Sequence, residues 1–241
     1  MPHYALLGGG RLARHMRHYL ALLNLPASGW ARDRNSALNS HAIDDPRRRL
    51  QATIEPASHV LLLVADGAIA EVVNSYPFLR EKTLLHCAGA LSFPGIAGAH
   101  PLMTFGDQLY DPEQYRRVPF IVERGYRFED LLPGLPNPHR EIAPESKARY
   151  HALCVMAGNF SQLLWDAVAA RFEGMDLPPA LLAPYLRQVT ENFIATRASA
   201  LTGPLSRGDR ATIERNLGAL AGDRLQGLYR AFLEFYSKAA A

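Results

Sequence analysis

The feature that most constrains the fold is a glycine-rich turn near the start of the chain. Gly8-Gly9-Gly10-Arg11-Leu12-Ala13 follows the apolar residues 4–7 and opens a stretch, 11–23, with apolar side chains at helical spacing. Residues 28–32 have the composition of a second strand. This strand–turn–helix–strand segment of about 30 residues has the size of a βαβ unit.

Each small residue of that turn has a physical role in such a unit. Gly8 allows the tight turn, Gly10 allows phosphate groups to approach the backbone, and Ala13 allows close helix–strand packing. The sequence therefore predicts a dinucleotide-binding Rossmann unit, with a ligand-free glycine turn as the alternative. The predicted pyrophosphate contacts are Gly8, Gly9, Gly10, Arg11 and Leu12.

Further apolar segments extend this pattern, and three are predicted as strands: Val60–Val64, Thr83–Ala88 and Pro119–Glu123. Three long helices are predicted after residue 143: 144–172, 179–201 and 210–237. The predicted fold is an α/β Rossmann-type doubly wound parallel sheet followed by an all-α C-terminal domain. We expect the Rossmann domain in 1–129, a linker rich in Pro, Gly and Asn in 130–143, and the helical domain in 144–241.

Composition excludes several classes of function. The 241 residues carry a net charge of +3, which is too weak to favour nucleic acid, and we expect Arg47, Arg48 and Arg49 to be solvated. No apolar run approaches about 18 residues, so no membrane span is expected. The two cysteines have no metal-ligand spacing, so no metal site is predicted. Together with an N-terminus unlike a signal peptide, they predict a cytoplasmic setting.

The residues after the second strand bear on the choice of cofactor. NAD-binding proteins usually carry Asp or Glu there, about 20 residues after the turn, to bind the ribose 2′-hydroxyl. This chain has Arg32 at that point and Arg34 close by. Guanidinium groups suit a 2′-phosphate, so NADP (NADPH) is the predicted cofactor. NAD, bound through Asp33, is the alternative.

Several segments together resemble one family. In chain order they are Gly8–Ala13, Val64-Ala65-Asp66, His86–Leu91, His100–Phe105 and Thr202–Asp209. The chain resembles the Rossmann-like proteins with a C-terminal helical domain of unknown function, DUF2520, usually described as NADP oxidoreductases. That family is related to pyrroline-5-carboxylate reductases, ketopantoate reductases and the 6-phosphogluconate dehydrogenase-like superfamily.

The resemblance implies an oxidoreductase, a homodimer and cofactor contacts from Val64, Ala65 and Asp66. Two departures are visible. The chain has Ala65 where the family often has proline, and Ala88 where it often has serine. The second removes a hydroxyl group near the expected nicotinamide end of the cofactor.

His100 is the first candidate for catalysis. It is expected to follow the last strands of the sheet core, at whose carboxyl ends ligands bind. Gly98-Ala99-His100-Pro101 is similar to a Gly-x-His-Pro segment of prephenate dehydrogenases. An imidazole titrates near neutral pH and could exchange a proton with substrate. A histidine that caps a loop is the equal alternative.

Lys147 and Asn159 are the other catalytic candidates. Lys147 shares a helix face with His151, four residues later. In the related dehydrogenases a Lys and an Asn four apart polarise the substrate oxygen, whereas Lys147 and Asn159 are twelve apart. A solvated surface lysine is the more ordinary interpretation of Lys147. Asn159 lies in an apolar stretch, where a buried amide needs partners.

The sequence thus predicts an NADP-dependent oxidoreductase acting on a small carbonyl, imine or 2-hydroxy acid in a cleft between the two domains. The predicted partners are this substrate and a second copy of the chain, without nucleic acid or membrane. A non-catalytic NADP-binding sensor or scaffold is the alternative. Convergent polar groups in the pocket would favour the enzyme, and a His100 turned away would favour the binder.

Overall fold

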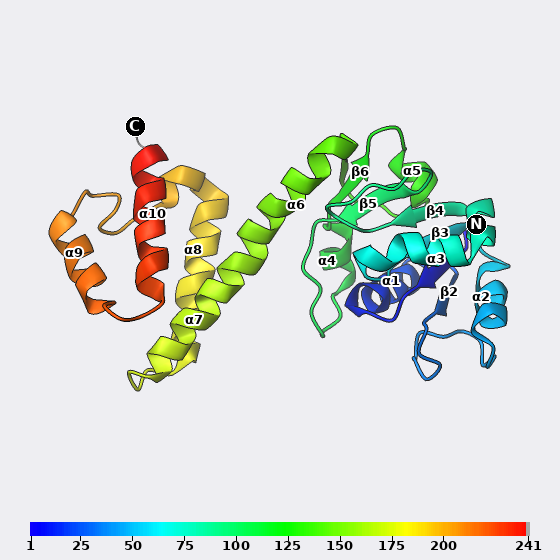
Figure 1. Ribbon diagram of the computed structural model, residues 1–241, viewed down its shortest axis with the longest axis horizontal. Coiled ribbons are helices and arrows are strands. Elements are labelled where there is room, and N and C mark those ends of the chain that lie inside the picture. Colours follow the sequence, from blue (N-terminus) through cyan, green and yellow to red (C-terminus); the bar gives the residue numbers. More distant parts are fainter. Residues whose placement is uncertain (240–241) are drawn as a thin grey trace. The chain divides into compact units, whose positions relative to one another are not determined.

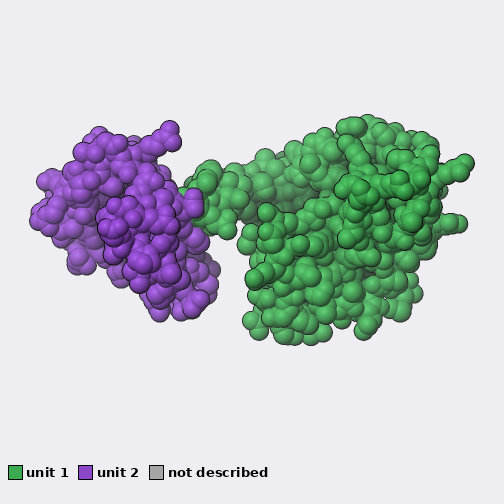
Figure 2. All heavy atoms as spheres, turned by 90° about the horizontal axis from the view of Figure 1, so that it is seen from below, with its two compact units in different colours: residues 1–163 green, residues 164–241 purple. Residues whose placement is uncertain are grey.

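The computed structural model describes residues 1–239 and divides the chain into two compact units. Unit 1 is Met1–Leu163 and unit 2 is Leu164–Ala241 (Figure 2). The boundary lies within a helix, so the first helical turns after the sheet belong to the Rossmann unit.

Unit 1 is built on a seven-stranded sheet of order β2-β1-β3-β4-β5-β6-β7 (Figure 1). The strands from β2 to β5 are parallel, which confirms the predicted Rossmann topology, while β6 runs antiparallel to β5 and pairs in parallel with β7. The strands are β1 Tyr4–Leu7, β2 Ala27–Trp30, β3 His59–Leu62, β4 Thr83–His86, β5 Ala97–Pro101, β6 Phe120–Glu123 and β7 His139–Ile142.

Two strands escaped the sequence analysis. β5 is composed of small residues, His and Pro, and β7 is a polar edge strand, so neither has the β-branched composition that marks a strand. The expected linker, 130–143, therefore contains the last strand of the sheet. His100 lies within β5, near its carboxyl end, rather than after the strands.

Helices cover both faces of the sheet. Tyr4 and Leu6 of β1 face one core with Met16 and Leu20 of α1, and Leu7 faces a second core with α2 and α3 residues. This division follows from side chains that alternate along each strand. The helices of this part are α1 Arg11–Leu22, α2 Pro46–Ile54, α3 Ile69–Ser75, α4 Pro112–Arg116 and α5 Phe128–Leu131.

The remaining helices are α6 Lys147–Val155, a π-helical segment Met156–Phe160, α7 Ser161–Glu173, α8 Leu182–Thr196, α9 Arg210–Ala219 and α10 Leu225–Ala239. The predicted third helix, 210–237, is wrong as one helix: the chain breaks between α9 and α10, where Gly222 has a φ of +82°. Asp209 caps α9, because its Oδ1 accepts a hydrogen bond from the Thr212 N–H at 3.1 Å.

Apolar side chains are widely exposed from α6 onward. Large examples are Leu163 at 66%, Phe193 at 60% and Ile194 at 74% exposed. The helix Pro144–Glu173 is long and apolar enough to cross a membrane by length and composition, with none of its most apolar 18-residue window buried. That window has a mean hydropathy of 1.2 with polar residues interspersed, so it is not the uninterrupted apolar run by which the sequence would have indicated a span.

Candidate functional site

The glycine turn forms an open cradle at the carboxyl end of β1. Gly8 has a φ of +148°, and a Cβ there would lie 2.2 Å from the Leu63 carbonyl oxygen. Only glycine fits that position. A Cβ on Gly10, in contrast, would meet nothing within 4 Å.

Gly10 is also the N-cap of α1, and no side chain caps this helix end. The first N–H groups of the helix therefore remain available to an anionic ligand. Leu12 packs partly against the core below the turn. At the end of the neighbouring β3, Ala65 and Asp66 are exposed and Val64 is half-buried, as a surface beside a bound cofactor would require. These residues fit a pyrophosphate at the turn.

The two arginines after β2 have different surroundings. Arg32 is exposed, and Arg34 forms an ion pair with Asp44, with 2.7 Å between Nη2 and Oδ1. Asp33 uses its Oδ1 to accept the Asn35 N–H within the loop. The loop is thus an ordered structure in which two of the three charged groups already have partners.

A cluster of aromatic and imidazole side chains lies along the same sheet edge, at the carboxyl end of β5. His100 Nδ1 is 2.8 Å from the hydroxyl oxygen of Tyr150 on α6. The ring of His151 lies edge-on to that of His100, with 5.8 Å between centroids. Both imidazoles crowd Gly89, where a Cβ would be 2.3 Å from His151 Cδ2 and 3.0 Å from His100 Nε2. A side chain at residue 89 would therefore displace one of these rings.

The electrostatic surroundings keep His100 neutral. Burial, and then the nearby His151 and Lys147, lower the pKa of His100 to about 4. This differs from the near-neutral titration expected from the sequence. Burial and the side chain of Cys154 raise the pKa of Tyr150 above its ordinary value. The pair therefore holds a neutral imidazole against a protonated phenol at pH 7.

Lys147 is buried, which overturns its interpretation as a surface lysine. It is 1% exposed, and its Nζ lies 2.5 Å from Oε1 of Glu123, itself 3% exposed, at the end of β6. Ser92 donates a second hydrogen bond to the same oxygen at 2.8 Å. The ion pair fastens the start of α6, and with it Tyr150 and His151, to the sheet.

His86 completes this buried group from the end of β4. Its Nδ1 accepts the Ala88 N–H at 3.1 Å, so the proton of the neutral ring resides on Nε2. Nε2 has no hydrogen-bond partner and lies 3.7 Å from Glu123 Oε1. Burial and then Lys147 lower the pKa of His86 to about 4, and Glu123 opposes them. The Nε2–H group is thus directed at the carboxylate without reaching hydrogen-bond distance.

The structure brings His100, Lys147 and His151 together and leaves Asn159 apart. Asn159 is exposed in the π-helical segment. It lies eight residues after His151, which is about 12 Å along a helix. The expected buried amide is therefore wrong for the single chain.

Sequence reasoning missed Glu123 and Tyr150. The signal for Glu123 was an acidic residue that ends an apolar strand, Phe120–Glu123. Nothing local identifies its partner, which is 24 residues away. Burial raises the pKa of the Cys87 thiol to about 12, so this cysteine stays protonated and is a poor nucleophile. Within residues 1–239, no group of three or more His, Cys, Asp or Glu side chains could hold a metal ion.

Comparisons with known proteins agree with this architecture. Residues 126–234 match the family model described as a domain of unknown function, DUF2520, as the sequence resemblance implied. No curated protein matches the chain in sequence.

Many solved structures share the fold, and three represent them. A provisionally named NADP oxidoreductase from Bacteroides fragilis has a TM-score of 0.77 at 21% identity, with 98% of each chain covered. An imine reductase from Streptomyces aurantiacus has a TM-score of 0.66 at 16% identity, covering 99% of this chain and 94% of that one. The pyrroline carboxylate reductase of Plasmodium falciparum, with NADP bound, has a TM-score of 0.61 at 12% identity, with both chains fully covered. These likenesses establish the Rossmann-type fold with its helical C-terminal part.

Proposed function

We propose, on the premise of this shared fold and the DUF2520 match, that the chain is an NADP-dependent reductase of a small carbonyl or imine compound, with a 2-hydroxy acid as product or substrate in one variant of the reaction. The observation that carries the proposal is the pairing of two features on one sheet edge. The glycine cradle lies at the end of β1, and a hydrogen-bonded His100–Tyr150 pair lies near the end of β5. Cofactor and substrate groups of Rossmann enzymes bind along such an edge.

NADPH would supply the hydride, and the chain's residues would do the rest. The N–H groups at the start of α1 and Gly10 would bind the pyrophosphate. Tyr150, which stays protonated, would donate its O–H to His100 Nδ1 and leave the proton of the neutral ring on Nε2. Nε2–H is beside Gly89, where it could pass its proton to the reduced substrate oxygen or nitrogen while Nδ1 takes the proton of Tyr150.

A panel of ketones, imines and 2-oxo acids with NADPH tests this proposal. For any substrate that is turned over, His100→Gln and Tyr150→Phe should each lower kcat/KM by about 10²-fold or more, the range for a lost acid–base group. Tyr126→Phe, a half-buried tyrosine elsewhere in unit 1, is the matched control. Retention of full activity by the His100 variant would exclude His100 from proton or hydrogen-bond donation.

The pH dependence gives a second test of the role of His100. With a pKa of about 4, His100 is neutral throughout the range from about pH 5.5 to about pH 8. The pH profile of the hydride-transfer rate should therefore have no inflection near pH 6.5 that is due to His100. The wild type and His100→Gln should have profiles of the same shape in this range. Such an inflection would mean that an imidazolium donates the proton.

A non-catalytic NADP-binding sensor or scaffold is the second candidate function. The observation that favours it is that Lys147 is buried in its ion pair with Glu123 and Asn159 is exposed, so the two groups do not converge as in the related dehydrogenases. The two candidates differ in a single-turnover experiment with NADPH and the substrate panel. Binding of NADPH without oxidation by any member of the panel would favour the sensor.

We also infer that the chain forms a homodimer through its helical part, in a cytoplasmic setting with both cysteines reduced. Among the described residues of unit 2, Leu182 is the one apolar residue that is buried, so the apolar helix faces need a cover. A second copy of the chain would cover these faces. Its presence would also account for the exposed apolar residues of the 144–173 helix without a membrane. Light scattering should give twice the mass of 26.7 kDa, and Ile194→Glu/Phe193→Glu should give the monomer. A wild-type monomer would contradict the inference.

A further inference from the structure

The cavity beside the glycine turn has a basic lining. It has a volume of about 550 Å³ and lies between α1 and the loop that follows β2. The turn contributes Gly9 and Gly10, α1 contributes arginines and the loop contributes Ser36. The polar residues that matter to its chemistry are Arg11, Arg14, Arg17 and Ser36. Arg32 and Arg34 do not line it.

We propose that the 2′-phosphate of NADPH is held at this cavity by Arg11, Arg14 and Ser36, rather than by Arg32 and Arg34. The inference rests on the proposed function, because it assigns a part of the cofactor that function requires. It names as specificity determinants two residues, Arg14 and Ser36, that the sequence did not indicate.

Ser36 lies next to the glycine turn. A Cβ on Gly9 would lie 3.9 Å from Ser36 Oγ and 3.4 Å from Ala31 Cβ, so the serine hydroxyl stands next to the glycine turn. Oγ accepts the Leu38 N–H at 3.3 Å, which leaves its O–H proton available to another acceptor. A phosphate beside Gly9 could accept that proton.

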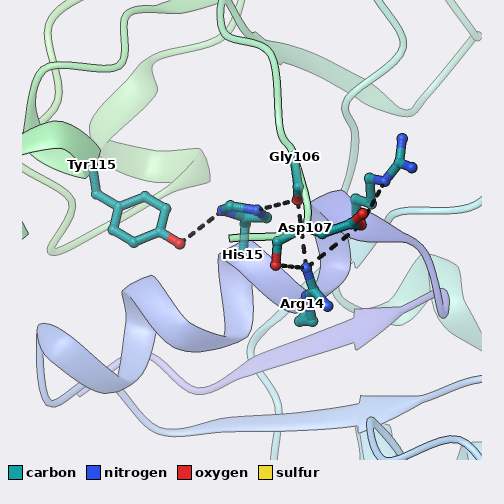
Figure 3. A network of polar contacts seen from close by, with 6 residues as sticks. Arg14, His15, Gly106, Asp107 and Tyr115 are labelled. Carbon is teal, nitrogen blue, oxygen red and sulfur yellow. Dashed lines mark hydrogen bonds and ion pairs between the residues drawn. The ribbon is translucent and has the colours of Figure 1, made fainter. Parts of the chain in front are cut away.

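Arg11 and Arg14 of α1 are held in place by the loop at residues 106–107. Arg11 Nε contacts Asp107 Oδ1 at 3.1 Å, and Arg14 Nη2 bonds the carbonyl oxygens of Gly106 and Asp107 (Figure 3). Asp107 is in turn fixed by its neighbour, because the Gly106 carbonyl accepts a hydrogen bond from His15 Nε2 at 2.9 Å. Arg11 thus uses one of its five N–H donors and keeps the Nη groups for an anion.

Charge also favours an anion at this place. Arg11, Arg14 and Arg17 bring three guanidinium groups to the cavity, against the single carboxylate of Asp107 outside its lining. Arg17 is committed to the loop, since its Nη1 bonds the Leu38 carbonyl at 2.8 Å. Arg11 contacts Asp107 through Nε and Arg14 bonds backbone carbonyl oxygens through Nη2, so the other N–H groups of both side chains suit the binding of a phosphate.

A buried arginine below the loop adds an independent observation. Arg49 of α2 is 1% exposed, and its Nη2 contacts the Ala31 carbonyl at 3.3 Å. Its Nε has no hydrogen-bond partner, and within residues 1–239 no carboxylate forms an ion pair with it. A buried cation that is balanced only by carbonyl oxygens leaves positive potential around Ala31, which adjoins Gly9 and Ser36. This overturns the expectation that Arg49 is solvated.

The loop that carries Arg34 is held in one conformation. Arg34 forms an ion pair with Asp44. Asn39 stabilises the loop around it, because its Nδ2 donates hydrogen bonds to the Asp33 and Arg34 carbonyl oxygens at 2.8 and 3.0 Å. Asn39 Oδ1 also accepts the Ala31 N–H at 2.8 Å. These hydrogen bonds of Asn39 hold the loop in the conformation in which Ser36 lines the cavity.

Equilibrium titrations of NADPH and NADH, followed by the fluorescence of the reduced nicotinamide, test the assignment without catalysis. The wild type should bind NADPH at least about tenfold more tightly than NADH, since charge-assisted bonds are strong. Arg11→Gln/Arg14→Gln should remove most of that preference and leave NADH affinity within about twofold, because the proposed pyrophosphate contacts of this turn are backbone N–H groups that the substitutions retain. Ser36→Ala should act in the same direction more weakly. Arg32→Gln/Arg34→Gln is the matched double variant and should leave the preference intact.

A fragment pair isolates the phosphate itself. In the wild type, 2′,5′-ADP should compete with NADPH far better than 5′-AMP does. In Arg11→Gln/Arg14→Gln, the two fragments should compete equally poorly. A selective loss of NADPH binding in Arg32→Gln/Arg34→Gln alone would overturn the assignment, as would equal losses of NADPH and NADH in Arg11→Gln/Arg14→Gln. If the wild type binds NADPH and NADH equally, the 2′-phosphate assignment is refuted, but dinucleotide binding at the glycine turn still stands. If the wild type binds neither nucleotide, the proposed function itself is refuted.

Discussion

Glu123→Gln removes the charge of the buried carboxylate while nearly preserving its shape. Lys147 is then left 1% exposed without its ion-pair partner, and the amide cannot neutralise the ammonium group. Breaking a buried pair by removing one partner costs about 3–5 kcal/mol. Since ordinary domains are stable by about 5–15 kcal/mol, the variant should lose a large share of its stability.

Urea unfolding followed by tryptophan fluorescence measures this loss. Trp30 is 4% exposed in the core of unit 1, whereas Trp165 is 38% exposed, so a Trp165→Phe background isolates the signal of the Rossmann unit. With a slope of about 1–3 kcal/mol per molar urea, a loss of about 4 kcal/mol lowers the midpoint by more than about 1 M.

Two further variants make the result interpretable. Glu123→Gln/Lys147→Met removes both charges and should recover most of the stability, because a buried pair can be replaced by apolar groups at little cost. Glu129→Gln removes an exposed carboxylate, 58% exposed, near His139 and should cost less than about 1 kcal/mol. A Glu123→Gln variant as stable as the Glu129 control would refute the reasoning, as would a double variant no better than the single one.

Two other predictions follow from the same region. Gly89→Ala should cost about 1–3 kcal/mol and break the His100–Tyr150 hydrogen bond, because its Cβ would lie 2.3 Å from His151 Cδ2; the imidazole NMR signals should shift, and unchanged signals would contradict the geometry. His86 has a folded-state pKa of about 4 and about 6.5 when unfolded, so the unfolded chain binds the additional proton between these values. Stability should therefore fall as the pH drops from about 6.5 to about 4, by about 2 kcal/mol at about pH 5 from this residue. His86→Gln should flatten that dependence, and an unchanged slope would contradict the assignment.

The local part of the fold could be predicted from the sequence. One short segment predicts the βαβ unit, because its elements are adjacent in the sequence. They are an apolar strand, the glycine turn and an amphipathic helix. β5 and β7 could not be found in this way. Their pairing with β4 and β6 is decided by tertiary contacts, which override a weak strand composition. The break before α10 depends on the left-handed conformation of Gly222, which helical spacing cannot indicate.

The sequence indicated some residues of the candidate site but not what they do there. His100 and Lys147 were indicated, but their behaviour depends on partners that are distant in the sequence: Tyr150 is 50 residues from His100, and Glu123 is 24 from Lys147. Burial by those partners turns an apparent surface lysine into a fixed internal charge and lowers the pKa of His100. Periodicity and motif spacing contain no information about such long-range pairs.

The central claim is that the turn after β1 binds the pyrophosphate of NADPH, and Gly10 offers the most direct test. A Cβ at residue 10 meets no protein atom within 4 Å, so Gly10→Leu should fold normally and place its side chain in the cradle. Gly218→Leu in α9, where a Cβ also meets nothing within 4 Å, is the matched control. In a fluorescence titration with NADPH, the wild type and Gly218→Leu should bind equally, and Gly10→Leu should bind at least about tenfold more weakly. Wild-type affinity in a folded Gly10→Leu protein would contradict the account.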